Sequence, residues 1–211
     1  MKKSYLPFVI IVIVLVAAVG LAVVMVRKHN SATADTGPVQ KPSPNQQVLL
    51  EEYGDYQCPP CGLLYPELKK LETDYGDRVH IVFHHYPIPK LHKNALAAAH
   101  AAEAARLQGK FWEMHDRLYR NQKAWADEDN PVPVFTSYAR ELGLDVDRFT
   151  RDMDSPQVKQ AVDNDLQAAT ARGVTGTPTV FIEGRQMRAE AMTAEGLHRA
   201  VDLMLEQKGS S

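Results

Sequence analysis

The fold is decided by one stretch of the sequence, Val48-Leu49-Leu50-Glu51-Glu52-Tyr53, and by the motif that follows it, Cys58-Pro59-Pro60-Cys61. The first six residues form an apolar run typical of a β-strand. After the motif, apolar side chains recur at the spacing of one helix face, at Cys61, Leu64, Leu68, Leu71 and Tyr75. The pattern predicts a strand-to-helix junction with Cys58 at the helix N-terminus and Cys61 one turn into the helix.

The chain has no cysteines besides these two, so no structural disulfide framework competes with them. A pair separated by two residues is well placed to alternate between dithiol and disulfide. The N–H groups and the dipole at a helix N-terminus favour a thiolate, which predicts Cys58 as the exposed, attacking sulfur. Cys61 shares the apolar helix face and is predicted to be the resolving thiol. Pro59 and Pro60 fit the first helical positions, because the N–H groups they lack have no intrahelical partner there.

Other uses of the cysteine pair are open at this point. A zinc site would need two more ligands, and His80, His84 and His85 lie in a strand-like run whose alternate residues face opposite sides. Covalent haem attachment needs a histidine directly after the second cysteine, where this chain has Gly62. A chance pair of buried structural cysteines is the strongest alternative. We expect no metal and no cofactor other than a redox-active Cys58–Cys61 disulfide.

The N-terminal segment suggests a compartment. Residues 6–26 are apolar or small and carry no charge, and about 20 such residues are needed to span a bilayer. We therefore expect residues 1–29 to be a membrane anchor or uncleaved signal, with cleavage near Ala32-Thr33-Ala34 as the alternative. Disulfide exchange has its main substrates outside the cytosol. This predicts a single-pass protein of the bacterial inner membrane with its catalytic domain on the periplasmic side.

The rest of the chain divides into a linker and one domain. Residues 30–47 are rich in Ser, Thr, Pro, Asn and Gln and are predicted to be a flexible linker. Residues 48–208 have the length of a single domain. The formal net charge of the chain is −2, and no basic patch or basic run interleaved with aromatic residues points to nucleic acid.

The remaining pattern is mixed α/β. A strand is expected over residues 79–86, followed by a long helical block that includes an alanine-rich segment. Thr177-Pro178 stands directly before a second strand-like run, Thr179-Val180-Phe181-Ile182, and is a candidate cis bond. A final helix is expected to begin after Thr193.

Taken in order, these features resemble DsbA-like thiol–disulfide oxidoreductases of the thioredoxin superfamily, in their membrane-anchored form. The resemblance rests on the Cys58-to-Cys61 motif, on Pro66, on Thr177-Pro178, and on the run from Phe111 to His115. It implies a thioredoxin-like α/β fold, with a central mixed sheet flanked by helices, a helical insertion over about residues 89–174, and a preceding transmembrane helix. It further implies that Thr177 and Pro178 bind substrate backbone beside the sulfurs, where Pro59 and Pro60 are further candidate contacts. Glu52, six residues before Cys58, matches a family glutamate that assists proton transfer at Cys61.

The implied function is an extracytoplasmic oxidoreductase that introduces disulfides into folding proteins. Its expected partners are protein thiols and a membrane redox protein, a DsbB-like quinone-linked oxidase. The family's strong oxidants carry a histidine between the cysteines, where this chain has Pro59 and Pro60. This departure leaves open the alternative of a reductase or isomerase kept reduced by a DsbD-like donor. A thioredoxin-like binding module without turnover is a third possibility.

Overall fold

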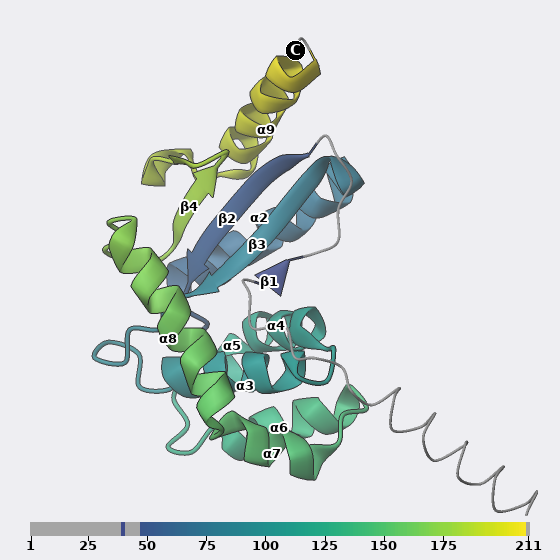
Figure 1. Ribbon diagram of the computed structural model, residues 1–211, viewed down its shortest axis with the longest axis vertical. Helices are drawn as coiled ribbons and strands as arrows, with labels where there is room; N and C mark the ends of the chain where they lie inside the picture. Colours follow the sequence, from purple (N-terminus) through teal and green to yellow (C-terminus); the bar gives the residue numbers. More distant parts are fainter. Residues whose placement is uncertain (1–38, 41–46, 210–211) are drawn as a thin grey trace, which may run out of the picture. The chain divides into compact units, whose positions relative to one another are not determined.

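The computed structural model describes Val39–Gln40 and residues 47–209 of the 211-residue chain. Its centre is a mixed sheet whose strands lie in the order β1-β3-β2-β4-β5 (Figure 1). The strands are β1 (Val39–Gln40), β2 (Val48–Gly54), β3 (Val79–His85), β4 (Thr179–Ile182) and β5 (Arg185–Gln186). β2 pairs in parallel with β3 and antiparallel with β4. The predicted thioredoxin-like fold, a mixed sheet flanked by helices, is confirmed for the described residues.

Helices follow the strands in the predicted order. They are α2 (Pro59–Tyr75), α3 (Ala95–Arg106), α4 (Phe111–Arg120), α5 (Gln122–Trp125), α6 (Val132–Glu141), α7 (Val146–Met153), α8 (Pro156–Ala171) and α9 (Ala194–Gly209), with short 3-10 turns at Gly76–Arg78 and Ala189–Ala191. The helices from α3 to α7 gather beyond the arrowheads of β2 and β3 (Figure 1). α3 fits closely among its neighbours because most of its buried residues are alanines.

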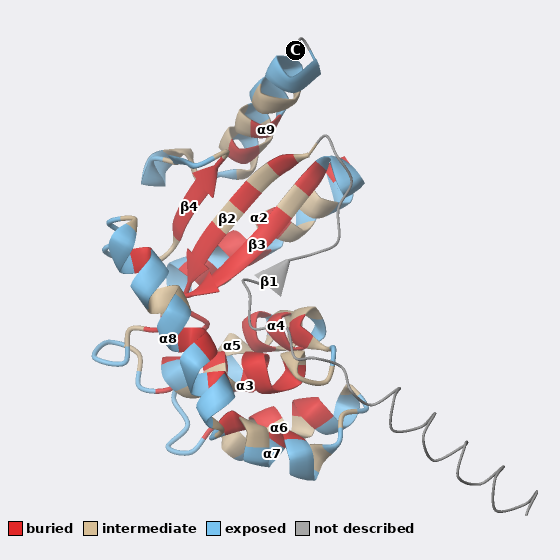
Figure 2. Cartoon of the chain, viewed as in Figure 1, coloured by how far each residue is buried: buried red, intermediate tan, exposed pale blue. Residues whose placement is uncertain are grey.

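The two faces of the sheet pack against different helices, because successive strand residues point to opposite sides. On one face, Val48 and Leu50 of β2 join a cluster with Leu64 and Leu68 of α2 and Leu197 of α9. On the other face, Tyr53 and Phe181 pack with Ala169 of α8. The central strands are therefore buried from both sides, as the red arrows of Figure 2 show. A third cluster fills the helical region and includes both cysteines.

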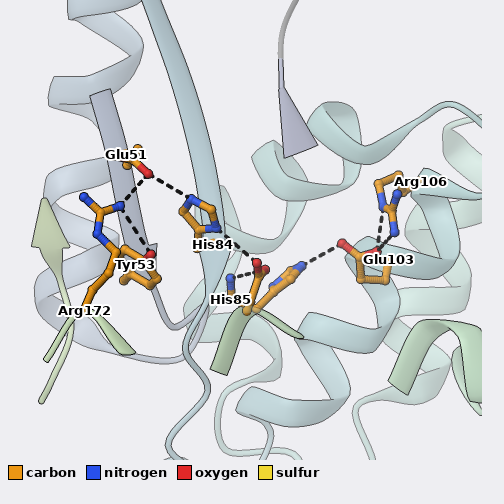
Figure 3. Close-up of polar contacts among 8 residues, drawn as sticks. Glu51, Tyr53, His84, His85, Glu103, Arg106 and Arg172 are labelled. Carbon is orange, nitrogen blue, oxygen red and sulfur yellow. Dashed lines mark hydrogen bonds and ion pairs between the residues drawn. The ribbon is translucent and has the colours of Figure 1, made fainter. Parts of the chain in front are cut away.

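Polar side chains tie the sheet to the helical region (Figure 3). Glu51 of β2 pairs with Arg172 at 2.5 Å and lies 3.5 Å from His84 Nε2. His84 Nδ1 lies 3.0 Å from Asp165 of α8. His85, next along β3, lies 2.9 Å from Glu103 of α3, and Arg106 pairs with the same carboxylate. The two histidines therefore hydrogen-bond within the core and hold α3 and α8 against the end of β3.

Two sequence predictions fall wholly or mostly outside the described residues. The predicted span at residues 6–26 lies outside them, and so does the predicted linker at residues 30–47, apart from Val39, Gln40 and Gln47. Val39–Gln40 form β1, which pairs antiparallel with β3. Within the described part of the chain, no helix is long and apolar enough to cross a membrane. The predicted transmembrane helix is therefore not confirmed.

Candidate active site

The cysteine pair lies at the junction of β2 and α2, as predicted. Cys58 occupies the N-cap of α2 with an extended backbone, and Pro59 and Pro60 are the first two helical residues. The N–H of Cys58 donates to the carbonyl of Asp55 at 3.1 Å, and the Cys58 carbonyl accepts from the N–H of Gly62 at 3.1 Å. Gly54 permits the tight exit from β2, because a Cβ there would collide with the ring of Phe83. Local backbone geometry thus aims the first cysteine out of the helix end.

The two sulfurs have opposite environments, and both are free thiols in this structure. Cys58 has 5% of its surface exposed and Cys61 has none. Cys58 is thus the more accessible sulfur, although it is far less exposed than the sequence suggested. Hydrogen bonding from the Cys61 side chain, and then from the Cys61 backbone, lowers the pKa of Cys58 to about 6. Burial raises the pKa of the Cys61 thiol well above its usual range.

Glu52 lies beneath this pair on β2. It shares the α2-facing side of the strand with Leu50, and it is 2% exposed. Burial, and then the nearby Cys58, raises the pKa of Glu52 to about 8. One of its carboxyl oxygens has no hydrogen-bond partner among the described residues. A buried acid of this kind, within electrostatic range of both cysteines, is suited to hold a proton near neutral pH.

The loop before β4 lies against the cysteines. The Thr177–Pro178 bond is cis, as the sequence led us to expect. The Cys58 thiol donates to the carbonyl of Thr177 at 3.5 Å, across 119 residues of sequence. The Thr179 hydroxyl donates to the carbonyl of Gly176 at 2.8 Å and holds the loop closed. Thr177 and Pro178 therefore stand beside Cys58, whereas Pro59 and Pro60 are exposed on its other side.

Sequence reasoning missed a polar residue of the helical region that supports the active-site turn. The amide of Gln122, at the start of α5, donates to the carbonyls of Tyr56 at 2.8 Å and Cys58 at 3.0 Å. A Cβ on Gly62 would stand 2.8 Å from the same amide, so Gly62 leaves room for this contact. In the sequence, Gly62 after Cys61 could have indicated a close contact at this point. Its neighbour Gln122 lies about sixty residues away, so spacing along the chain does not identify it.

Sequence reasoning also missed Asp55, in the turn before Cys58. Its carboxylate is buried and accepts a hydrogen bond from His92.

A groove of about 620 Å³ begins beside the first turn of α2. Its lining includes Pro59, Gly62 and Leu63 on one side and Arg120, Gln122 and Lys123 on the other. Leu63 is 76% exposed and offers apolar surface to the groove. The groove could receive chain flanking a substrate cysteine. Among the described residues, no three metal-binding side chains stand together as a metal site would require.

Comparison with known proteins agrees with this geometry. A family model described as thioredoxin matches residues 42–203. The chain is 37% identical over 177 residues to the Na(+)/H(+) antiporter NhaA 3 of Salinispora tropica, covering 82% of this chain and 26% of that protein. It is 40% identical over 142 residues to the Na(+)/H(+) antiporter NhaA of Herminiimonas arsenicoxydans, covering 67% of this chain and 22% of that protein. The chain thus spans about a quarter of the length of these curated relatives.

Solved structures give the same fold. A thioredoxin-like oxidoreductase from Silicibacter pomeroyi is 29% identical, with a TM-score of 0.64, and the match covers 79% of this chain and 91% of that one. BdbD from Bacillus subtilis is 18% identical, with a TM-score of 0.71 and coverage of 80% and 93%. The thiol–disulfide exchange protein alpha-DsbA2 from Wolbachia pipientis is 22% identical, with a TM-score of 0.68 and coverage of 81% and 88%. The predicted resemblance to DsbA-like thiol–disulfide oxidoreductases is confirmed at the level of the fold, and the 29% identical neighbour is itself named as an oxidoreductase.

The localisation predicted from the sequence is contradicted and is corrected. The curated relatives are named as ion antiporters, not as single-pass, membrane-anchored oxidoreductases. Within Val39–Gln40 and residues 47–209, no helix is suited to cross a membrane. The prediction relied on the length of one apolar run, which lies outside the described residues. The placement in the bacterial inner membrane with a periplasmic domain is therefore withdrawn.

Proposed function

The chain belongs to the thioredoxin family, and from that premise we propose that it exchanges disulfides with protein thiols through Cys58 and Cys61. The observation that carries the proposal is the geometry of the pair: Cys58 stands at the N-cap of α2 with Sγ 3.5 Å from the Thr177 carbonyl, next to the cis Thr177–Pro178 bond, while Cys61 is fully buried. The pKa values of the two thiols shift in opposite directions, which agrees with this arrangement. Cys58 has a pKa of about 6 and is largely thiolate at neutral pH, whereas burial keeps Cys61 protonated. Only a thiolate attacks a disulfide efficiently, so Cys58 is expected to react first and Cys61 to act as the resolving thiol.

In the oxidising direction, a substrate thiolate attacks Cys58 Sγ of the Cys58–Cys61 disulfide. The S–S bond breaks, and Cys61 leaves as the mixed disulfide forms. A second substrate thiolate then attacks the substrate sulfur of that mixed disulfide, and Cys58 leaves as a stabilised thiolate. The substrate has lost two electrons and the pair has gained them. Cys61 resolves the mixed disulfide when the same steps run in reverse.

Glu52 handles the proton of the buried sulfur in this scheme. The leaving Cys61 thiolate is costly in a buried site, so it must take up a proton as it forms. Glu52 has a pKa of about 8, holds a proton near neutral pH and can transfer it to Cys61. In the reverse direction the carboxylate receives the proton as Cys61 attacks. Its neighbour Glu51 cannot do this, because it faces the other side of the sheet and pairs with Arg172.

Substrate chain is proposed to dock on both sides of Cys58. Thr177 and Pro178 stand next to the sulfur, with the Thr177 carbonyl 3.5 Å from Sγ, and offer backbone to which an extended segment can add. Pro59 and Pro60 present an exposed, stiff surface on the other side. The groove that begins at Pro59 then receives residues flanking the substrate cysteine.

The proposed direction is oxidation of substrate thiols. A stabilised Cys58 thiolate stabilises the reduced pair, and a stabilised reduced pair makes the disulfide more oxidising. A redox partner, such as a DsbB-like quinone-linked oxidase, would then restore the disulfide. The alternative is a reductase or isomerase supplied with electrons by a DsbD-like donor. The ion transport named for the curated relatives is not proposed for this chain, because the match covers only about a quarter of their length.

Equilibration of the purified chain with glutathione buffers tests the direction, with thiolate absorbance followed across pH. An oxidase should have a potential well above that of thioredoxin, about −270 mV, and a Cys58 pKa near 6. A potential as low as thioredoxin's, with a Cys58 pKa close to that of a free thiol, would favour the reductase. If replacing both cysteines with serine left the activity of the chain unchanged, the chain would be a binding module and not an oxidoreductase.

A further inference from the structure

Asp55 places a buried carboxylate in the turn that leads into Cys58. Its side chain is fully buried and accepts three hydrogen bonds, from the N–H of Gln57 at 2.8 Å, the N–H of Ile88 at 2.9 Å and Nδ1 of His92 at 2.7 Å. The carbonyl of the same residue accepts from the N–H of Cys58. A negative charge is therefore held against the end of α2 at which the reactive sulfur lies.

This charge opposes the formation of a Cys58 thiolate. Hydrogen bonding from Cys61 lowers the pKa of Cys58, whereas burial and then the charge of Asp55 raise it. Pro59 and Pro60 add neither positive charge nor a side-chain hydrogen-bond donor beside the sulfur. Two of the three groups bound to the Asp55 carboxylate are backbone amides, which are neutral. The third, His92, is an imidazole, the only one of the three groups that can exist in a charged form.

We propose that His92 is a positioning residue for the redox pair: by binding Asp55 it offsets the negative charge beside Cys58 and so favours the thiolate. The proposal deepens the proposed exchange of disulfides and rests on it for its functional meaning. Nδ1–H of His92 donates to Asp55, and a proton on Nε2 makes the histidine–aspartate pair neutral overall. A more stable thiolate stabilises the reduced pair, so the contact makes the disulfide more oxidising.

The surroundings of His92 support this assignment. Its side chain is 17% exposed, so solvent can deliver a proton to the ring. The adjacent Lys93 pairs with Asp129 at 3.2 Å and donates to the carbonyl of Asp127. The carboxylate that faces His92 in this turn is Asp55, which lies three residues before Cys58.

The test replaces His92 with glutamine, whose amide can still donate to Asp55 but cannot be charged. His92→Gln is expected to raise the Cys58 pKa, so that the acid dissociation constant of the thiol falls about three- to tenfold, where tenfold corresponds to one pKa unit. The equilibrium constant with glutathione should shift by a similar factor toward a less oxidising disulfide. His198→Gln is the matched control, because His198 contacts Asp74 at the same 2.7 Å at the far end of α2. It should leave both quantities unchanged.

A second variant separates the effect of the Asp55 charge from the effect of the local structure around it. Asp55→Asn removes the carboxylate and should lower the Cys58 pKa, and in that background His92→Gln should have no further effect. If His92→Gln does not fold, the double variant Asp55→Asn/His92→Gln is used instead, because both side chains are then neutral amides that can bind each other. Its Cys58 pKa should be at or below that of the parent chain.

A lower melting temperature for His92→Gln with an unchanged Cys58 pKa and glutathione constant would overturn the proposal and leave His92 a purely structural role. If the parent chain exchanged no disulfides but its thiolate titration still responded to His92→Gln, the proposed function would fall and the electrostatic inference would stand.

Discussion

The neighbouring residues Glu51 and Glu52 lie on opposite faces of β2, and their carboxylates have different surroundings. Glu51 points toward α8, where it pairs with the guanidinium of Arg172 at 2.5 Å and lies 3.5 Å from His84 Nε2. Glu52 points toward α2, where one carboxyl oxygen has no hydrogen-bond partner among the described residues and its pKa rises to about 8. A buried charge with partners holds a structure together, whereas a buried acid without them stays ready to exchange a proton. The contrast supports the proposal that disulfide exchange takes place on the α2-facing side of β2.

The first prediction asks whether the chemistry depends on the sulfurs of the α2 side. Cys58→Ser should reduce disulfide exchange to the uncatalysed rate, because the remaining thiol, Cys61, is fully buried and cannot reach a substrate disulfide. Cys61→Ser should instead trap mixed disulfides with substrate, visible on non-reducing gels, because the resolving thiol is gone. The roles are reversed if Cys61 reacts before Cys58 with a bulky alkylating reagent.

The second prediction compares the two glutamates directly. Glu52→Gln should slow the step that involves Cys61 by about a hundredfold, the typical contribution of a positioned acid or base. Glu51→Gln should leave that rate within about twofold but lower stability by about 1–3 kcal/mol, since Arg172 loses a charged partner. Stopped-flow fluorescence and urea unfolding measure the two effects. Equal rate losses in both variants would remove the distinction between the two faces.

The third prediction concerns stability against pH. The folded pKa of Glu52, about 8, lies above its ordinary value of 4.5, so the folded chain binds more protons than the unfolded chain between these pH values. Stability should therefore fall as pH rises through this window, and Glu52→Gln should remove the fall. The oxidised protein is the sample to use, because the lowered pKa of Cys58 makes the reduced form more stable as pH rises from about 6. Urea unfolding measures the free energy of unfolding at pH 5 and pH 8. Between these pH values it should fall by more than about 1 kcal/mol further in the parent than in Glu52→Gln.

The smallest expected effect concerns the groove beside α2. Leu63→Ser should raise KM for a cysteine-containing peptide about two- to fivefold at unchanged kcat, because it removes exposed apolar contact area and no reacting group. Leu203→Ser is the control, since Leu203 is 49% exposed on α9 and lies outside the groove. An equal rise in both variants would show that the groove does not bind substrate.

The sequence by itself was enough to determine the class of fold and the position of the redox pair. The apolar run before Cys58 and the helical spacing after Cys61 are short-range patterns, and β2 and α2 lie where those patterns predict. Thr177-Pro178 could likewise be identified from the strand that follows it. Such features are readable because backbone periodicity depends on residues only a few positions apart.

Only the tertiary structure determines the surroundings that set the pKa values of the two thiols. Gln122 reaches the carbonyl of Cys58 across 64 residues of sequence, and His92 reaches Asp55 across 37. Glu51 and Glu52 are identical residues side by side, and only the helices packed on each face of the sheet make one a structural partner and the other a candidate proton carrier. These contacts join residues far apart in the chain, and no local period encodes them. The thiolate of Cys58 is therefore a product of the folded chain, although the sequence indicates where it will form.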